Sequence, residues 1–520
     1  MPTVRKVRIT ALAAGLLCAL WAFIGWLAVI PNQDILADGI QAQSLLIDPR
    51  IVLAFPGQKH GLPLEYPFTI FFEWLFPGNY YANGVIRILL AFLTGYFTGR
   101  LALALVPGTR VWALLLAIGL GPTIIHGLQG PGVWWLQPNY DMAWLLITAG
   151  ALTLASVPGE TPGSRPLSKN VLKYLGAGLL FGLGISAHPV MILMAIPLGS
   201  LVLLIKRIRP TQVLLSLVGL AVGMVPAVIN YFVNDEVNVW DPSHKPFIYP
   251  EWIWTMGRRV MGLDGIPDPG TAILPYSLDL SPTQTPFSGI VQSLIVFAIL
   301  SACLALAITG TIRAARTRQW ISPLISLALA WLVAAGTPIV FITVVNPVYF
   351  YGAGNAVLAW ISIGALPSLI SGPLIGRTIT IAFFAMFGLS TLAQNAHYLS
   401  SLPERVVNKR ETLEKWRSTA TALSDAGVDI IYGSYLDAIP IGYVSNWKLR
   451  TVTYDYNRFP LQPSHMNEAT VLVAARVNDD DENAQKALEI MRRECTPLTT
   501  LDAFGTWSYQ MSDCPTLELR

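Results

Sequence analysis

The sequence predicts an α-helical polytopic membrane protein with a small α/β domain at its C-terminal end. Hydrophobic residues make up 53% of the 520 residues and charged residues 12%, whereas roughly a quarter of the residues of a soluble chain are charged. Lysine and arginine stand singly between apolar runs and form no basic face, which argues against a nucleic-acid partner. A soluble composition returns only after residue 396.

The first apolar run follows the basic start "MPTVRKVR". It extends over about 22 residues, longer than the roughly 7 to 15 residues of a signal-peptide core, and it lacks a small-residue cleavage site. We therefore interpret residues 9–30 as a retained first transmembrane helix, with Arg5, Lys6 and Arg8 in the cytoplasm.

Further apolar runs are long enough to cross a membrane, which takes about 20 residues per helix. They lie near residues 84–106, 111–127, 138–156, 171–187, 189–205, 211–232, 288–311, 321–344, 349–371 and 376–396. Together with the first helix, these runs predict about eleven crossings.

Alternate connections between these runs hold the positive charge. The positive-inside rule places those connections in the cytoplasm of a plasma-membrane protein. Loops 31–83 and 233–287 and the tail then lie on the extracytoplasmic side. We expect a transmembrane domain at 1–396, with the catalytic groups on its two outer loops, and an extracytoplasmic domain at 397–520.

The tail has the pattern of a small α/β domain. "VDIIYGSY", "KLRTVTYDY" and "EATVLVAARV" are typical of strands, and "DENAQKALEIMRREC" is typical of an amphipathic helix. Cys495 and Cys514 lie near each other in the tail, so a disulfide is expected if the tail faces an oxidising compartment. Two unrelated free thiols are the alternative.

The first outer loop is rich in polar residues. Asp34 and Asp38 would share one face of a short helix over "DILADGIQAQSLLID". Such a helix in the membrane interface would turn both acids toward water and its apolar residues toward lipid. Alternatively, Asp34 only caps the helix. The residues expected to face lipid are Ile35, Leu36, Ile40, Leu45 and Leu46.

Several segments occur in an order found in one known family. Asp34 follows the first transmembrane helix, where the family has a "DE" pair, and "GQKHGLPLE" ends at Glu65, where the family has "GQxYxGSLE". "GLGISAHPVMILMAIP", "NPVYFYGAGNAVLAWISIG" and "IIYGSYLDAIPIGYVS" follow in the family order. The chain thus resembles the type C glycosyltransferases, in their bacterial family 39-like, dolichyl-phosphate-mannose-type branch. It departs from them at Ile35, which replaces the second acid, and at Asn346 and Pro347, which replace an arginine.

The resemblance implies an inverting glycosyltransferase. It would move one monosaccharide from a polyprenyl-phosphate donor to a glycan, lipid or protein acceptor of the cell envelope, on the extracytoplasmic face. Asp34 would be the catalytic base, and Asp38 is the candidate to replace the missing second acid. No Walker-type phosphate loop, dinucleotide fingerprint, HExxH or GxSxG motif is present, which agrees with a reaction that needs no ATP.

The proposed chemistry assigns roles to the polar residues of the outer loops. A departing phosphate needs cations, and arginine holds phosphate best through its bidentate fork. Contact with lipid headgroups is the alternative for the cations, and turn closure or helix capping is the alternative for the other polar groups. The candidates for donor-phosphate binding are Lys59, His60, Arg258 and Arg259, and those for acceptor or sugar binding are Gln58, Glu65 and Asp141. We expect no cofactor; a divalent metal is compatible with the chemistry, but no metal-ligand motif indicates one.

Two other functions are compatible with such a chain. A secondary transporter or lipid flippase of envelope precursors would place charges near the bilayer midplane and often shows two matching halves; here the polar residues cluster in outer loops and no half-repeat is visible. A non-catalytic assembly or sensor protein would explain the tail but leaves the acidic first loop without a role.

Overall fold

The structure is a computed structural model, and it describes part of the chain. Apart from a few isolated positions, the described residues are 4–28, 33–47, 62–106, 108–119, 138–157, 167–188, 191–233, 356–369, 399–428, 430–433, 435–453, 473–476, 496–501 and 508–512.

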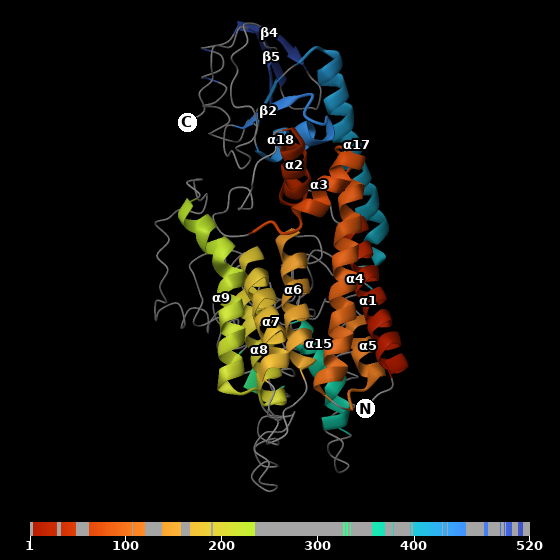
Figure 1. The fold of residues 1–520 in the computed structure, drawn as a ribbon. Coiled ribbons are helices and arrows are strands. Elements are labelled where there is room, and N and C mark those ends of the chain that lie inside the picture. The colour runs from red at the N-terminus through yellow and green to blue at the C-terminus, as the bar shows by residue number, and fades with distance from the viewer. Residues whose placement is uncertain are drawn as a thin grey trace, which may run out of the picture.

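Apolar helices run side by side as an elongated bundle (Figure 1). Four of the described helices are long and apolar enough to cross a membrane, in the segments Val4–Ala28, Gly84–Leu105, Asn170–Ala187 and Pro210–Asn230. The prediction of an α-helical polytopic membrane protein is confirmed, whereas the runs expected at 288–311, 321–344 and 376–396 fall almost wholly outside the described residues. The bundle helices are α1 (Val4–Ala28), α4 (Tyr80–Leu105), α5 (Val111–Gly119), α6 (Pro138–Ala155), α7 (Leu167–Ala187), α8 (Ile192–Lys206), α9 (Pro210–Val233) and α15 (Ala356–Leu369).

Small residues set the distances between these helices. A Cβ added at Gly95 of α4 would lie 2.6 Å from the carbonyl oxygen of Ala14 in α1, and one at Gly99 would lie 2.9 Å from the Cα of Ala11. In lipid, helices associate through such close packing, because apolar side chains gain nothing by leaving the hydrocarbon. Helices α7 and α9 meet in the same way at Gly178, Gly182, Gly219 and Gly223.

A second layer covers one end of the bundle, opposite the N-terminus (Figure 1). Helices α2 (Gln33–Ile47) and α3 (Tyr66–Leu75) come from the loop at 31–83, and α17 (Leu402–Asp425) and α18 (Tyr435–Val444) come from the tail. The first loop and the tail therefore lie at the same end of the molecule, as the charge pattern predicts.

The tail contributes a five-stranded mixed sheet beyond α18. Its order is β2-β1-β3-β5-β4; β1 is parallel to β2 and β3, and β5 is antiparallel to β3 and β4. The first three strands fall within the segments predicted as strands, but β1 ends at Gly433 and Tyr435 already begins α18. The predicted helix over 481–495 lies almost wholly outside the described residues. The strands are β1 (Ile430–Gly433), β2 (Arg450–Thr453), β3 (Val473–Arg476), β4 (Thr496–Leu501) and β5 (Ser508–Ser512).

Leu36, Ile40 and Leu45 of α2 are buried in the protein and do not face lipid, contrary to the sequence prediction, whereas Leu46 is 39% exposed and the Ile35 side chain is not among those described. Leu36 is 2% exposed and Ile40 is 0% exposed. Both pack in one cluster with Leu413 of α17 and with Ile439 and Tyr443 of α18. The predicted helix is present, but Leu36 and Ile40 pack on a distant part of the same chain rather than on the bilayer.

Lys409 attaches α17 to the bundle. Its ammonium lies 4.8, 4.5 and 5.2 Å from the ring centroids of Trp26, Tyr80 and Tyr81, and it donates to the carbonyl oxygen of Trp26. Burial lowers the pKa of Lys409 to about 7, while the ring faces and the carbonyl oxygen favour the cation. This one side chain joins α17 to the adjacent ends of α1 and α4.

The close approach of α1 and α4 can be tested at Gly95. Gly95→Ala should lower the melting temperature of the detergent-solubilised protein, because the new methyl group meets the α1 backbone, and overpacking typically costs about 1 to 3 kcal/mol. Gly176→Ala is the matched control, since a Cβ there has no atom within 4 Å. Equal melting temperatures for the two variants would contradict the packing.

The burial of Lys409 predicts a pH dependence of stability. Its pKa falls from an ordinary value of 10.5 to about 7 on folding, so between these values the unfolded chain binds a proton that the folded chain lacks. The free energy of unfolding therefore rises with pH in this window. Melting temperatures of the purified protein should show this rise, and Lys409→Met should reduce it, whereas Lys415→Met, which removes an exposed lysine of α17, should not. Identical profiles for the native chain and Lys409→Met would refute the prediction.

Candidate functional site

The predicted site residues differ in what the structure describes. Asp34 and Asp38 lie one turn apart in α2, as predicted, and Asp34 is the second residue of that helix. Glu65 and Asp141 are described with their side chains. The other predicted residues, Gln58, Lys59, His60, Arg258, Arg259, Cys495 and Cys514, lie outside the described residues.

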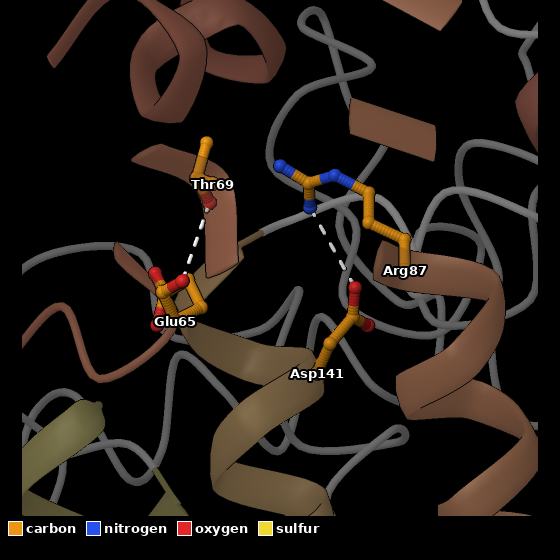
Figure 2. Close-up of polar contacts among 4 residues, drawn as sticks. All are labelled: Glu65, Thr69, Arg87 and Asp141. Carbon is orange, nitrogen blue, oxygen red and sulfur yellow. Dashed lines mark hydrogen bonds and ion pairs between the residues drawn. The ribbon is translucent and has the colours of Figure 1, made fainter. Parts of the chain in front are cut away.

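Asp141 belongs to a buried ion pair. It lies in the first turn of α6, and its Oδ2 is 3.6 Å from the Nη1 of Arg87 in α4, with exposures of 2% for Asp141 and 4% for Arg87. Figure 2 shows the two groups pointing toward one another from these helices. Neither charge is stable alone in an apolar bundle, so the pair joins α4 to α6.

Arg87 was not predicted from the sequence as a site residue. It stands within the apolar run "GVIRILLAFL", and an ionisable residue inside a transmembrane segment is a site candidate by default. The sequence could therefore have marked Arg87 as a site candidate. Its partner, Asp141, could not be identified without knowing that α4 and α6 lie side by side.

Glu65 is also buried, with 1% exposure. Its carbonyl oxygen accepts hydrogen bonds from the amides of Phe68 (3.0 Å) and Thr69 (3.2 Å) and from the Thr69 hydroxyl (3.4 Å; Figure 2). The backbone of Glu65 thus closes the turn that begins α3, and its side chain makes no capping bond there. Turn closure therefore does not explain why the side chain is a carboxylate.

These three charged residues converge at one end of the bundle. Glu65 precedes α3, Arg87 lies in α4 and Asp141 lies in α6. A residue beside each of them in sequence belongs to a single apolar cluster, formed in part by Leu64, Ile86 and Met142. This cluster holds the start of α3 against α4 and α6.

The segment before Glu65 crosses the end of α7. The amide of Leu62 donates to the carbonyl oxygen of Ser186 (2.8 Å), and the Ser186 hydroxyl donates to the carbonyl oxygen of Gly223 in α9 (2.9 Å). The loop at 31–83 is thereby attached to α7 and α9. Gln58, Lys59 and His60 directly precede this attachment in sequence.

A further buried carboxylate, Glu73 of α3, was not predicted from the sequence. It is 0% exposed. Its Oε2 accepts hydrogen bonds from the Gln43 side-chain amide (3.0 Å) and from the Gly78 backbone amide (3.0 Å), and its Oε1 accepts one from the Tyr443 hydroxyl (2.6 Å). The signal in the sequence is a single acid within "FTIFFEWLF".

Metal ligation finds no support among these residues. Within the described ranges, no group of three or more His, Cys, Asp or Glu residues is placed to hold a metal ion. Two of the buried carboxylates instead have partners in the protein: Asp141 pairs with Arg87, and Glu73 accepts a hydrogen bond from Tyr443.

Comparison with known proteins identifies the fold. No protein-family model matches the sequence, and no curated protein matches it. The structure is similar to that of ArnT from Cupriavidus metallidurans bound to undecaprenyl phosphate, with a TM-score of 0.55 and 12% sequence identity over 98% of each chain. A weaker likeness, with a TM-score of 0.42 and 12% identity, extends to the oligosaccharyltransferase of Archaeoglobus fulgidus and covers 99% of this chain and 75% of that one.

The whole-length likeness to ArnT shows that the chain has the type C glycosyltransferase fold, as the resemblance in the sequence predicts. At this level of identity the likeness concerns the fold, and function must be argued from the site. The assignment to the family 39-like branch stays a prediction.

The Arg87–Asp141 pair can be tested by a double-mutant cycle. Asp141→Asn or Arg87→Gln alone leaves an uncompensated buried charge, which costs about 3 to 5 kcal/mol. The double variant removes both charges and should therefore melt at a higher temperature than at least one of the single variants. Strictly additive losses of stability would show that the two residues act independently.

Proposed function

We propose that the chain is an inverting glycosyltransferase that moves a monosaccharide from a polyprenyl-phosphate-linked donor to an acceptor of the cell envelope. The observation that carries the proposal is the position of α2. This helix bears Asp34 and Asp38 and packs on α3 and α18 at the end of the bundle where Glu65, Arg87 and Asp141 converge (Figure 1). Support also comes from the fold, since ArnT, with the same fold, was crystallised with undecaprenyl phosphate bound.

The reaction requires a base and cations. As the acceptor oxygen bonds to the anomeric carbon, the bond from that carbon to the phosphate oxygen breaks, and polyprenyl phosphate leaves with the electron pair. Asp34 takes the proton of the acceptor hydroxyl, and the single displacement inverts the anomeric centre. Lys59, His60, Arg258 and Arg259, which lie outside the described residues, are the proposed cations for the phosphate.

The buried charged residues have supporting roles in this proposal. Asp141 holds Arg87, and the pair fixes the ends of α4 and α6 beneath the site. Glu65, whose carboxylate is not needed to close its own turn, orients a hydroxyl of the acceptor or sugar together with Gln58. Asp38 takes the place of the second acid that Ile35 replaces.

The proposed orientation places α2, α3 and the sheet outside the plasma membrane and the N-terminus in the cytoplasm. Polyprenyl-linked sugar and membrane lipid are then the partners on the outer face, together with a glycan, lipid or protein acceptor. Cys495 and Cys514 would pair in this oxidising environment. A domain boundary near residue 397 belongs to the same proposal.

The proposal predicts that Asp34→Asn abolishes transfer and that Asp38→Asn has a smaller effect. Asparagine keeps the size of aspartate and most of its capping ability, but it cannot act as a base, and general-base catalysis is worth roughly a hundredfold to ten-thousandfold in rate. The measurement is the rate of label transfer from a polyprenyl-phosphate sugar by each purified variant, beside its melting temperature. Near-normal transfer by a well-folded Asp34→Asn protein would remove Asp34 from the mechanism.

A further inference from the structure

The hydrogen bonds of Glu73 join three separate parts of the chain. Gln43 lies in α2, Gly78 lies in the turn between α3 and α4, and Tyr443 lies in α18. All three donors point to one carboxylate on α3. The first outer loop and the tail therefore share a polar connection that neither segment could make alone.

Hydroxyl and amide groups donate hydrogen bonds to both oxygens of the Glu73 carboxylate. Such bonds are roughly twice as strong when the acceptor is ionised. Glu73 is wholly buried, so its loss would leave three buried donors without this acceptor, and each unsatisfied donor is costly.

Glu73 sets the position of the helix that carries the proposed base. Gln43 is on the same helix as Asp34 and Asp38, and α2 is stiff over this length. The apolar side of α2 packs on α18 next to Tyr443. A shift of Glu73 would therefore move α2 against both the bundle and α18, together with its acids.

The other face of α3 is apolar and exposed. Phe68, Phe71 and Trp74 are 52%, 53% and 65% exposed, and aromatic side chains of this kind gather at the membrane–water boundary. Helix α3 thus turns one face toward the lipid interface and holds α2 with the other. The depth of α2 relative to the bilayer follows from this arrangement.

We propose that Glu73 is a positioning residue of the transferase: it holds α2 between α3 and α18 at the depth where a membrane-bound polyprenyl phosphate presents its sugar. The inference rests on the proposed function. It predicts that changes at Glu73 alter the turnover of bound substrate, because misplacement of a reacting group by a distant residue can cost on the order of a hundredfold in rate.

The decisive variant is Glu73→Gln, which keeps the size of the side chain but turns one acceptor atom into a donor. We expect kcat for transfer to fall on the order of tenfold to a hundredfold, with little change in the KM for the donor, at a temperature where the variant is folded. Tyr443→Phe removes only the bond to α18 and should have a smaller effect in the same direction. Exchange of the two groups, in Gln43→Glu/Glu73→Gln, restores a carboxylate–amide pair and should recover part of the lost rate.

Gly95→Ala is the control for a general loss of stability, because it destabilises the bundle at the distant contact between α1 and α4. An equal fall in kcat for Gly95→Ala, at a matched margin below its melting temperature, would overturn the positioning role. An unchanged kcat in Glu73→Gln would do the same.

A distance measurement separates this proposal from the proposed function. Spin labels at Leu46 of α2 and at Lys448, just after α18, both exposed positions, should give a narrow distance distribution that broadens or shifts in Glu73→Gln. If the native chain uses no polyprenyl-phosphate sugar, the proposed function fails. An unchanged distance distribution overturns the role of Glu73 by itself.

Discussion

A buried carboxylate needs hydrogen-bond donors, and the donors of Glu73 come from α2, the α3–α4 turn and α18. These hydrogen bonds join the loop at 31–83 to a helix of the tail, a contact that could not be predicted from the sequence of the loop. Apolar contacts of Leu36 and Ile40 follow the same path, and Lys409 adds a second link from α17 to α1 and α4. The acidic helix α2 is therefore held on a rigid support.

In the helix bundle, the helices are held together by close packing rather than by hydrogen bonds to a buried carboxylate. Glycines bring α1 to α4 and α7 to α9, because close van der Waals contact is the main source of helix association in the bilayer. The Arg87–Asp141 pair lies close to the end of α4 and α6 that meets α3. A transporter typically places such charges near the midplane, whereas the described pair lies nearer to one end of the bundle.

Much of the fold could be predicted from the sequence because a long apolar run in lipid is stable as a transmembrane helix. Helices α4, α6 and α9 follow those runs closely, and the type C fold was indicated by the order of short motifs. The pairing of Arg87 with Asp141 and of Glu73 with Tyr443 could not be predicted, because each depends on helices brought together from distant parts of the chain. The lipid-facing assignment of Leu36 and Ile40 was wrong for the same reason.

The proposed transferase moves a sugar to its acceptor and releases the lipid carrier. The most direct measurement follows a set of labelled polyprenyl-phosphate sugars on purified protein in liposomes, without ATP, and quantifies free polyprenyl phosphate beside labelled acceptor. We expect one polyprenyl phosphate to be released for each sugar transferred, with inversion at the anomeric carbon. Movement of the intact labelled lipid across the bilayer, with no polyprenyl phosphate released, would contradict this expectation and establish a flippase instead.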